Sequence, residues 1–571
     1  MQQKISELKP WLKLWKAELP PLSDFECTTF EYIMAKNAGH EDDIALNYFD
    51  RRITFREFFR NVEDTAKAYT SLGVKKDDII TLVSVMTPET IYTFYAMSYV
   101  GAVLNMADPR TSPAGLHEYI SEAHSKVVVV LSDAYDKMRE AVVGTEVEKV
   151  IVVSPADSLG CVKKALYRLT KPDKRKYDDN VIFWPDFIKR KDTVDSILRV
   201  RYNPDHAALI VHTGGTTGKP KGVLLGAKAL NALAYQMSLN RFHRQERFLN
   251  IMPPFIAYGY GSGVHTPLSA GAEVILIPAF DPAEFGKLLN KYHPEHTAGV
   301  PLHYQNLLTD KAVRNTDLSW LISTGSGGDA ISKQAEEDVN AFLKAHHAPY
   351  PLCKGYGMTE VSAGVATSMK EINRAGSVGI PLALITVGIF EPGTENELGF
   401  NEEGEVCVTG PNNMLGYYEM PEETANVMRR HSDGLEWVHT GDVGYMDEDG
   451  YLYIVNRLKR VIIRHDGFKI FPFVIENAIG SVEGVDAAYA VAIKDPDHAQ
   501  GLLPHVFLRK KADCTISDDE LIKKVRATCE KEIPEYCLPY SYSMISDVPY
   551  TKIGKIDYIK LAEMAANRQC G

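Results

Sequence analysis

Short runs of β-branched and aliphatic residues alternate with longer amphipathic segments in the first half of the chain. The apolar spacing of 54–73 predicts a helix that ends at Gly73. The runs at 79–85 (IITLVSV), 126–132 (KVVVVLS) and 149–154 (KVIVVS) predict buried strands. Strands that alternate with helices in this way favour a parallel sheet with helices on its faces.

The pattern changes twice further along the chain. It resumes at 207–213 (AALIVHT), which predicts a second α/β unit, and the apolar runs then shorten and glycines multiply over 386–449, as is typical of a small β-rich unit. A separate segment with a strand at 489–495 and a helix over 518–531 follows. We place the main domain boundary near 456–459, before this segment.

One insertion, 159–176 (LGCVKKALYRLTKPDKRK), carries seven Lys or Arg residues, and its single acid is Asp173. Two interpretations stay open, a solvated surface excursion or an interfacial helix that meets anionic lipid. The apolar residues that could share one face of such a helix are Leu159, Val162, Leu166 and Leu169.

The N-terminal stretch MQQKISELKPWLKLWKAELPP is also amphipathic. We expect it to dock on its own domain, with contact to a membrane surface as the alternative; the apolar residues concerned are Ile5, Leu8, Trp11, Leu12 and Trp15. It lacks the continuous apolar core of a secretory signal, and no run in the chain approaches the ~20 apolar residues of a membrane span. We therefore expect a soluble protein that is at most peripheral at the membrane.

Composition narrows the class of protein. The chain has 571 residues, 45% hydrophobic and 24% charged, an ordinary globular composition that needs more than one core. Its net charge of −12 argues against a nucleic-acid partner, which usually requires a basic domain. The eight cysteines include no C-x-x-C pair, so neither a zinc site nor a disulfide framework is indicated. We expect a reduced, cytoplasmic protein of unknown oligomeric state.

The segment 209–225 (LIVHTGGTTGKPKGVLL) places many N–H and O–H donors, with little side-chain bulk, after a predicted strand. Glycines let backbone N–H groups approach oxygens closely, and lysine adds charge, so the segment predicts a phosphate-binding loop. It is not a Walker A loop, because Thr213 stands where the first glycine is needed and Pro220 follows Lys219.

Two further loops carry groups suited to a nucleotide. In 353–360 (CKGYGMTE), Tyr356 could stack on a base, and Glu360 could hold a hard cation through its oxygens. In 439–442 (HTGD), Asp442 could accept the two hydroxyls of a ribose. Either loop alone is a weak indication, because tyrosine–glycine turns and loop carboxylates are common.

Two basic residues lie beyond these loops. Arg457 begins RLKRVIIRHDGFKIFP (457–472) at the predicted domain boundary, and PYTKIGKIDY (549–558) presents Lys555 from a glycine turn. With these segments the chain, from about residue 25 to about 565, resembles the adenylate-forming superfamily of acyl-CoA synthetases, firefly luciferase and peptide-synthetase adenylation domains. Five motifs in the family's order make the resemblance specific.

The resemblance implies that ATP and a carboxylate form an acyl-AMP and pyrophosphate, after which the thiol of coenzyme A displaces AMP. Lys555 and Arg457 would be catalytic, and Thr217 and Glu360 would hold Mg²⁺. The residues that the resemblance assigns to the nucleotide are Thr213, Gly214, Gly215, Thr216, Thr217, Gly218, Lys221, Gly327, Gly355, Tyr356, Gly357, Thr359, Glu360, Asp442, Arg457 and Lys459.

The resemblance also implies a fold and a domain division. The fold would be α/β, with a large N-terminal domain of two α/β subdomains and a small β-barrel-like unit, followed by a small mobile α+β C-terminal domain. Residues 1–456 would form the adenylating domain that binds ATP and the acid, and 457–571 the mobile domain with the catalytic lysine. In this family the small domain rotates between the two half-reactions, and Lys459 occupies the hinge position.

The acid is less well specified than the nucleotide. Many relatives carry a histidine where Ile256 stands. Two interpretations stay open: Phe255 or Tyr258 substitutes for it, or the acid tunnel is wider. The segment 252–263 has no acidic residue to grip an α-amino group, which favours a fatty or aryl acid over an amino acid. The basic insertion and the amphipathic N-terminus would suit an enzyme that gathers fatty acids at a membrane.

We therefore expect an ATP-dependent acyl-CoA synthetase for a medium- or long-chain fatty acid. One alternative is a free-standing acyl-AMP ligase that loads a carrier protein, and another is an aryl-acid CoA ligase. A non-catalytic relative that binds acyl groups or nucleotide is a hypothesis of another class.

Overall fold

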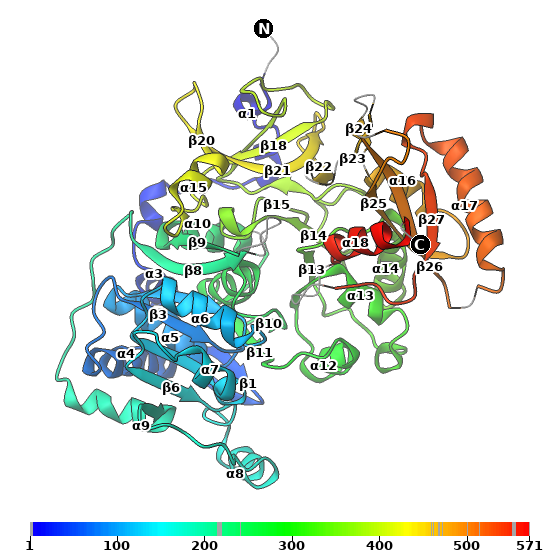
Figure 1. The fold of residues 1–571 in the computed structure, drawn as a ribbon. Coiled ribbons are helices and arrows are strands. Elements are labelled where there is room, and N and C mark those ends of the chain that lie inside the picture. The colour runs from blue at the N-terminus through cyan, green and yellow to red at the C-terminus, as the bar shows by residue number, and fades with distance from the viewer. Residues whose placement is uncertain are drawn as a thin grey trace.

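The computed structural model describes residues 4–213, 220–239, 241–457, 460, 462–465, 469–470, 472–498, 501–512, 514–550 and 556–569 (Figure 1). The chain forms two large sheets, a small antiparallel sheet and a C-terminal α+β part, and the strands of the two large sheets are interleaved in the sequence. This arrangement confirms the predicted α/β fold class.

The first large sheet has eight strands. They lie in the order β19 (Gly416–Tyr417), β9 (Lys221–Gly226), β8 (Ala207–Thr213), β4 (Val103–Ala107), β3 (Ile79–Val83), β5 (Val127–Leu131), β6 (Lys149–Val153) and β7 (Val181–Phe183). From β8 to β7 neighbouring strands are parallel, as the alternating pattern predicts, and β9 and β19 are added antiparallel. The hairpin of β8 and β9 therefore places the predicted phosphate loop at the carboxyl end of a parallel strand, a usual ligand position in such sheets.

The second large sheet has nine strands. Their order is β16 (Ile380–Pro381), β15 (Ala366–Thr367), β14 (Cys353–Tyr356), β13 (Ser323–Gly327), β12 (His296–Gly299), β10 (Arg247–Asn250), β11 (Glu273–Leu276), β1 (Ile44–Tyr48) and β2 (Arg51–Thr54). The strands from β14 to β1 are parallel, and the edge strands are antiparallel. A second α/β unit is thus present, but its predicted start at 207–213 is wrong, because β8 joins the eight-stranded sheet while β1 and β2 from near the N-terminus join the nine-stranded one.

Helices on the faces of the two sheets share one apolar core. Its members include Phe58 of α4, Tyr95 of α5, Leu104 of β4 and Val274 of β11, so α4 and α5 connect the sheets. The helix predicted over 54–73 is α4 (Phe55–Ser71), where the Thr54 hydroxyl accepts the N–H of Glu57 at the start. Between the N-terminal stretch and the small sheet, the helices are α3 (Thr29–Lys36), α4, α5 (Pro88–Val100), α6 (Pro113–Glu122), α7 (Tyr135–Ala141), α8 (Cys161–Thr170), α9 (Trp184–Lys189), α10 (Ala227–Ser238), α11 (Thr266–Ser269), α12 (Phe285–Tyr292), α13 (Pro301–Leu307) and α14 (Lys333–Ala345).

The predicted β-rich unit is a five-stranded antiparallel sheet, drawn in yellow at the top of Figure 1. It consists of β17 (Thr386–Phe390), β18 (Gly404–Thr409), β21 (Glu436–Met446), β20 (Met428–Arg430) and β22 (Leu452–Arg457), with α15 (Pro421–Val427) beside it. The C-terminal part contains β23 (Ile462–Ile463), β24 (Lys469–Ile470), α16 (Pro472–Gly480), β25 (Val485–Lys494), β26 (Leu502–Lys510), α17 (Asp518–Glu532), β27 (Ser541–Met544) and α18 (Tyr558–Gln569).

The N-terminal stretch docks on its own domain, which confirms the favoured interpretation. It forms the short helices α1 (Ile5–Leu8) and α2 (Leu12–Trp15). The side chains of Ile5, Trp11 and Trp15 are buried against the core of the five-stranded sheet. Since these anchoring side chains are covered, the alternative of an N-terminal membrane contact is wrong for them. Within the described residues, no helix combines the length and apolarity needed to cross a bilayer.

Candidate active site

The predicted base-binding and ribose-binding residues meet in space. Tyr356 ends β14, and its hydroxyl donates a hydrogen bond of 2.6 Å to Oδ2 of Asp442 on β21. Asp442 is only 3% exposed, and its backbone lies opposite that of Arg457 in the register of β21 and β22. Because two different sheets supply these residues, the site lies where the nine-stranded and five-stranded sheets adjoin.

Glycines allow the backbone to pass closely at this junction. Gly327 and Gly355 are register partners on β13 and β14, and a Cβ on Gly327 would lie 3.2 Å from the carbonyl oxygen of Gly355. A Cβ on Gly357 would lie 1.5 Å from the carbonyl oxygen of Ala363, which no side chain can accommodate. Gly357 is therefore required by the turn itself, whatever the turn binds.

Glu360 is buried beside these glycines, in the turn Thr359–Val361 (η7). Its Oε1 accepts a hydrogen bond of 2.8 Å from the hydroxyl of Tyr417, and its Oε2 makes no hydrogen bond to any residue that the structure describes. Burial, together with the Glu360 carboxylate, raises the pKa of Tyr417 above its ordinary value, so the hydroxyl remains a donor. One carboxylate oxygen of Glu360 thus remains for a hard cation.

The two ends of the predicted phosphate loop are held together. Thr213 and Lys221 are register partners on β8 and β9, and the Thr213 hydroxyl donates to the carbonyl oxygen of Lys221 at 3.5 Å. The ammonium of Lys221 pairs with Glu423 on α15 and lies 4.9 Å from the ring centroid of Tyr417. Lys221 and Glu360 therefore share Tyr417 as a neighbour, which places the base of the phosphate loop beside the candidate metal ligand.

Several predicted site residues lie outside the described part of the chain. They are Gly214, Gly215, Thr216, Thr217 and Gly218 of the phosphate loop, Lys459 at the predicted hinge, Lys555, and the side chain of Arg457. Their roles stay predictions.

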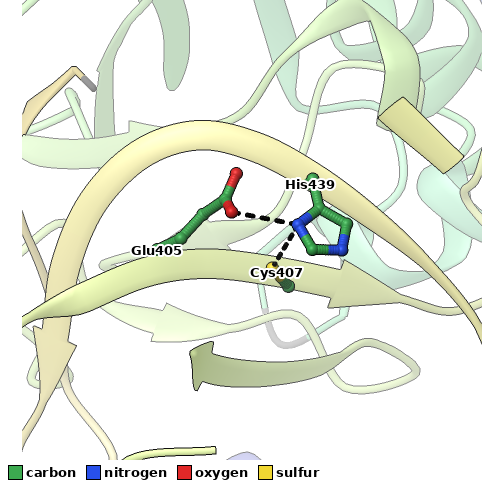
Figure 2. Close-up of side chains that lie close together, drawn as sticks. All are labelled: Glu405, Cys407 and His439. Carbon is green, nitrogen blue, oxygen red and sulfur yellow. Dashed lines mark hydrogen bonds and ion pairs between the residues drawn. The ribbon is translucent and has the colours of Figure 1, made fainter. Parts of the chain in front are cut away.

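A buried hydrogen-bonded cluster supports the part of β21 that carries Asp442, which the sequence analysis expected to be a loop (Figure 2). Nδ1 of His439 lies 3.0 Å from Oε2 of Glu405 and 3.5 Å from Sγ of Cys407. The other carboxylate oxygen of Glu405 accepts the N–H of Gly441 at 3.1 Å, and Nε2 of His439 lies 3.0 Å from Nε2 of His431. Glu405 thereby links β18 to the irregular part of β21 that carries Asp442.

Glu405, Cys407 and His439 are close enough to hold a metal ion, but hydrogen bonds already satisfy the cluster. With His439 donating from Nδ1 to Glu405, its Nε2 accepts from His431. Burial raises the pKa of the Cys407 thiol well above its ordinary value, which opposes the thiolate that a metal requires. We interpret the cluster as a support for this part of β21. The seven cysteines within the described residues are free.

Three residues near the site are not identifiable from the sequence: Glu405, Tyr417 and Glu423. Tyr417 follows Gly416 in an ordinary turn sequence and lies 57 residues from Glu360, so no spacing links the two. Glu405 and Glu423 look like surface acids in the sequence. Only the packing of the sheets shows what they contact.

The segment with the candidate acid-binding residues packs against the glycine-rich strand β13. The Tyr258 hydroxyl donates to the carbonyl oxygens of Gly299 and Gly325, at 3.3 and 3.4 Å, and burial raises its pKa. Phe255 is buried, and Ile256 packs partly buried against the same core. The structure therefore offers an uncharged wall at this position.

The fold and the convergence of these loops define an adenylate-forming enzyme. Residues 34–418 match the family described as AMP-binding enzyme, and 474–555 match the AMP-binding enzyme C-terminal domain. The chain belongs to the AMP-binding enzyme family, which confirms the resemblance inferred from the motifs.

Relatives across the family support an AMP-forming acid–thiol ligase. The chain is 28% identical over 565 residues to "Long-chain-fatty-acid--CoA ligase" of Bacillus subtilis (strain 168), covering 97% of this chain and 98% of that protein. It is 28% identical to "4-coumarate--CoA ligase CCL1" of Humulus lupulus, covering 88% and 87%. The solved anthranilate CoA ligase AuaEII with anthranoyl-AMP has a TM-score of 0.81 at 19% identity, covering 97% and 100% of the two chains, and supports the fold.

Proposed function

We propose that the protein is an ATP-dependent acyl-CoA synthetase that activates a medium- or long-chain fatty acid. The observation that carries the acid class is the uncharged wall of Phe255, Ile256 and Tyr258, which offers no partner for an α-amino group. The near full-length similarity to a bacterial long-chain-fatty-acid–CoA ligase agrees with it.

The first half-reaction joins two anions. The carboxylate oxygen attacks the α-phosphorus of ATP, the bond from phosphorus to the bridging oxygen breaks, and pyrophosphate leaves. Charge neutralisation and alignment supply most of the catalysis in such a step. Lys555 would bridge the attacking carboxylate and the α-phosphate as a point charge on a long stem, with Arg457 beside the nucleotide.

Residues in the described part of the chain would bind the nucleotide. Asp442 accepts the ribose hydroxyls, and Tyr356 both fixes that carboxylate and offers a ring to the adenine. Lys221 and the loop from Thr213 bind the phosphates. The buried Glu360, with Oε2 open to a ligand, suits Mg²⁺, and Thr217 would be its second ligand; the ion would neutralise phosphate charge.

In the second half-reaction the thiol of coenzyme A attacks the acyl carbon and AMP leaves. We propose that residues 1–456 and 457–571 are the two domains and that the second rotates about Lys459 between the steps. The two separate family matches, 34–418 and 474–555, support the division.

The experiment that tests this function is pyrophosphate release from ATP and Mg²⁺ over a panel of fatty, aryl and amino acids, with and without coenzyme A. We expect release with fatty acids and AMP formation that depends on coenzyme A. Release without turnover of coenzyme A would instead identify a ligase that loads a carrier protein. Silence with every acid would contradict an enzymatic role.

An aryl-acid CoA ligase is the second candidate. The 4-coumarate ligases among the relatives favour it, and so does the aromatic side chain of Tyr258 in the wall. The same panel of acids distinguishes a fatty-acid substrate from an aryl-acid substrate. We propose a cytoplasmic location, with contact to a membrane surface as argued below.

A further inference from the structure

Helix α8 (Cys161–Thr170) lies within the basic insertion, and none of its residues is buried. Figure 1 shows it at the lower margin of the molecule, beyond the eight-stranded sheet. Most helices in proteins are stabilised by packing of an apolar face. A helix whose apolar face has nothing packed on it therefore indicates a binding partner.

One side of α8 is fixed to the body of the protein by two lysines. The ammonium of Lys163 donates to Oδ2 of Asp50 at 2.6 Å and to the carbonyl oxygen of Phe49 at 2.7 Å. The ammonium of Lys164 donates to the carbonyl oxygen of Asp157 at 2.9 Å. These contacts determine which side of the helix faces the protein.

The opposite side is apolar and exposed. Val162, Leu166 and Leu169 are spaced as neighbours on one helical face, and they are 83%, 59% and 80% exposed. At 3.6 residues per turn, the centre of this face lies about 140° around the helix from the two lysines. Leu159, which the sequence analysis placed on the same face, instead packs partly buried against the core. The apolar face therefore points away from the body.

Basic residues on the helix and directly after it in the sequence accompany this face. Arg168 on the helix and Lys171, Lys174 and Lys176 directly after it are exposed, and within the described residues none of the four forms an ion pair. The whole chain has a net charge of −12, so this concentration of cations opposes the general trend of the surface. Aliphatic side chains rimmed by lysine and arginine are the pattern of a helix that lies in a membrane interface.

We propose that α8 and the basic segment 171–176 dock the protein on an anionic lipid surface. The apolar side chains enter the boundary between headgroups and acyl chains, and the cations bind lipid phosphates. A bilayer fits better than an acidic protein, because three aliphatic side chains on a convex, isolated helix need no complementary groove to be covered. This docking is independent of the reaction chemistry, so it stands or fails separately from the proposed function.

Flotation with vesicles tests the docking. We expect the full-length protein to float with vesicles of phosphatidylglycerol and phosphatidylcholine, and to float far less with phosphatidylcholine alone. High salt should weaken the binding, because it screens exposed charges. Equal binding to both kinds of vesicle, or binding to neither, would overturn the proposal.

Variants of α8 locate the binding surface. We expect the double substitution Leu166→Ser and Leu169→Ser, and separately Lys174→Glu and Lys176→Glu, to weaken partitioning about tenfold or more. The matched controls are Leu198→Ser, at a leucine that is 93% exposed elsewhere, and Lys523→Glu with Lys524→Glu on α17. These controls should bind as the unchanged protein does.

Two results would overturn the proposal. If the unchanged protein binds no vesicles but forms a dimer in sedimentation velocity, and the α8 variants lose that dimer, the face would be assigned to a second copy of the chain. Vesicle binding that the α8 variants leave unchanged would assign lipid docking to another surface. Acid-dependent pyrophosphate release, measured without vesicles, should stay the same in every variant, which shows that the variants are folded.

Discussion

At the scale of single residues, the site depends on side chains that hold other side chains in place. Asp442 accepts a hydrogen bond from the hydroxyl of Tyr356. Glu405 accepts a hydrogen bond from the N–H of Gly441, the residue before Asp442, and so helps to hold it in place. Tyr417 similarly lies between Lys221 and Glu360. The two carboxylates that we propose bind the ribose and the metal thus each have a neighbour that holds them in position.

Replacing Asp442 by Asn tests its proposed role with ribose. A carboxylate can accept both ribose hydroxyls, and hydrogen bonds to charged groups contribute about 1.5–3 kcal/mol each. We expect the KM for ATP to rise at least about tenfold in pyrophosphate-release assays. The control Tyr356→Phe keeps the carboxylate and should have a smaller effect. An unchanged KM in the Asp442 variant would contradict the assignment.

His265 provides a prediction about pH. It is fully buried, with Nδ1 2.9 Å from the hydroxyl of Tyr95 and Nε2 3.0 Å from Oδ1 of Asn231. Burial lowers its pKa from 6.5 to about 3. Between these values the unfolded chain binds the proton and the folded chain does not, so stability falls as the pH decreases, by about 1.4 kcal/mol per unit.

Thermal unfolding between pH 7 and pH 4 measures this effect, because this range covers most of the window between the ordinary and the lowered pKa. We expect the decline in Tm towards low pH to be shallower in His265→Gln than in the unchanged protein. The exposed His347→Gln should leave the decline as it was. Equal slopes in all three proteins would mean that His265 does not contribute.

At the scale of elements, packing decides what an amphipathic segment does. The N-terminal helices and α8 have similar amphipathic patterns in the sequence. The side chains of Ile5, Trp11 and Trp15 are nevertheless buried, whereas no residue of α8 is buried. Trp15 is 1% exposed, and its Nε1 donates to the carbonyl oxygen of Pro381 at 2.9 Å. Val162 on α8 is 83% exposed. Periodicity alone cannot separate these two cases.

Trp15→Ala tests the docking of α2. Removing a buried aromatic side chain costs about 3–5 kcal/mol of unfolding free energy. We expect a clearly lower Tm for this variant. Leu12→Ala on the same helix, at a residue 36% exposed, should stay within about 0.5 kcal/mol of the unchanged protein. Equal losses of unfolding free energy in both variants would mean that the buried Trp15 side chain makes no specific contribution to stability.

At the scale of the whole molecule, the active site is shared between segments far apart in the chain. Thr213, Glu360 and Asp442 come from three different sheets or their loops, and the proposed catalytic Lys555 falls within the match to the AMP-binding enzyme C-terminal domain, 474–555. A lysine supplied by a rotating domain can serve one half-reaction and then withdraw. Adenylation and thioester formation should therefore respond differently to its loss.

Lys555→Ala tests this separation. We expect pyrophosphate release to fall by several orders of magnitude, while thioester formation from supplied acyl-AMP is retained. The matched control is Lys560→Ala, at an exposed lysine on α18, which should affect neither step. Equal loss of both steps in the Lys555 variant would contradict the role that we assign to it.

The sequence by itself determined the strand and helix pattern, because apolar periodicity follows directly from the two geometries, and α4, β3, β5 and β6 lie where the pattern predicts them. Its motifs also determined the family. Only the tertiary structure brought Glu405 into contact with Gly441, next to Asp442, and Tyr417 into contact with Glu360. Contacts between distant strands depend on sheet order and register, which local sequence does not encode. The tertiary structure alone also decided that the N-terminal tryptophans are covered while the apolar face of α8 is exposed, because burial depends on what the rest of the fold places against each face.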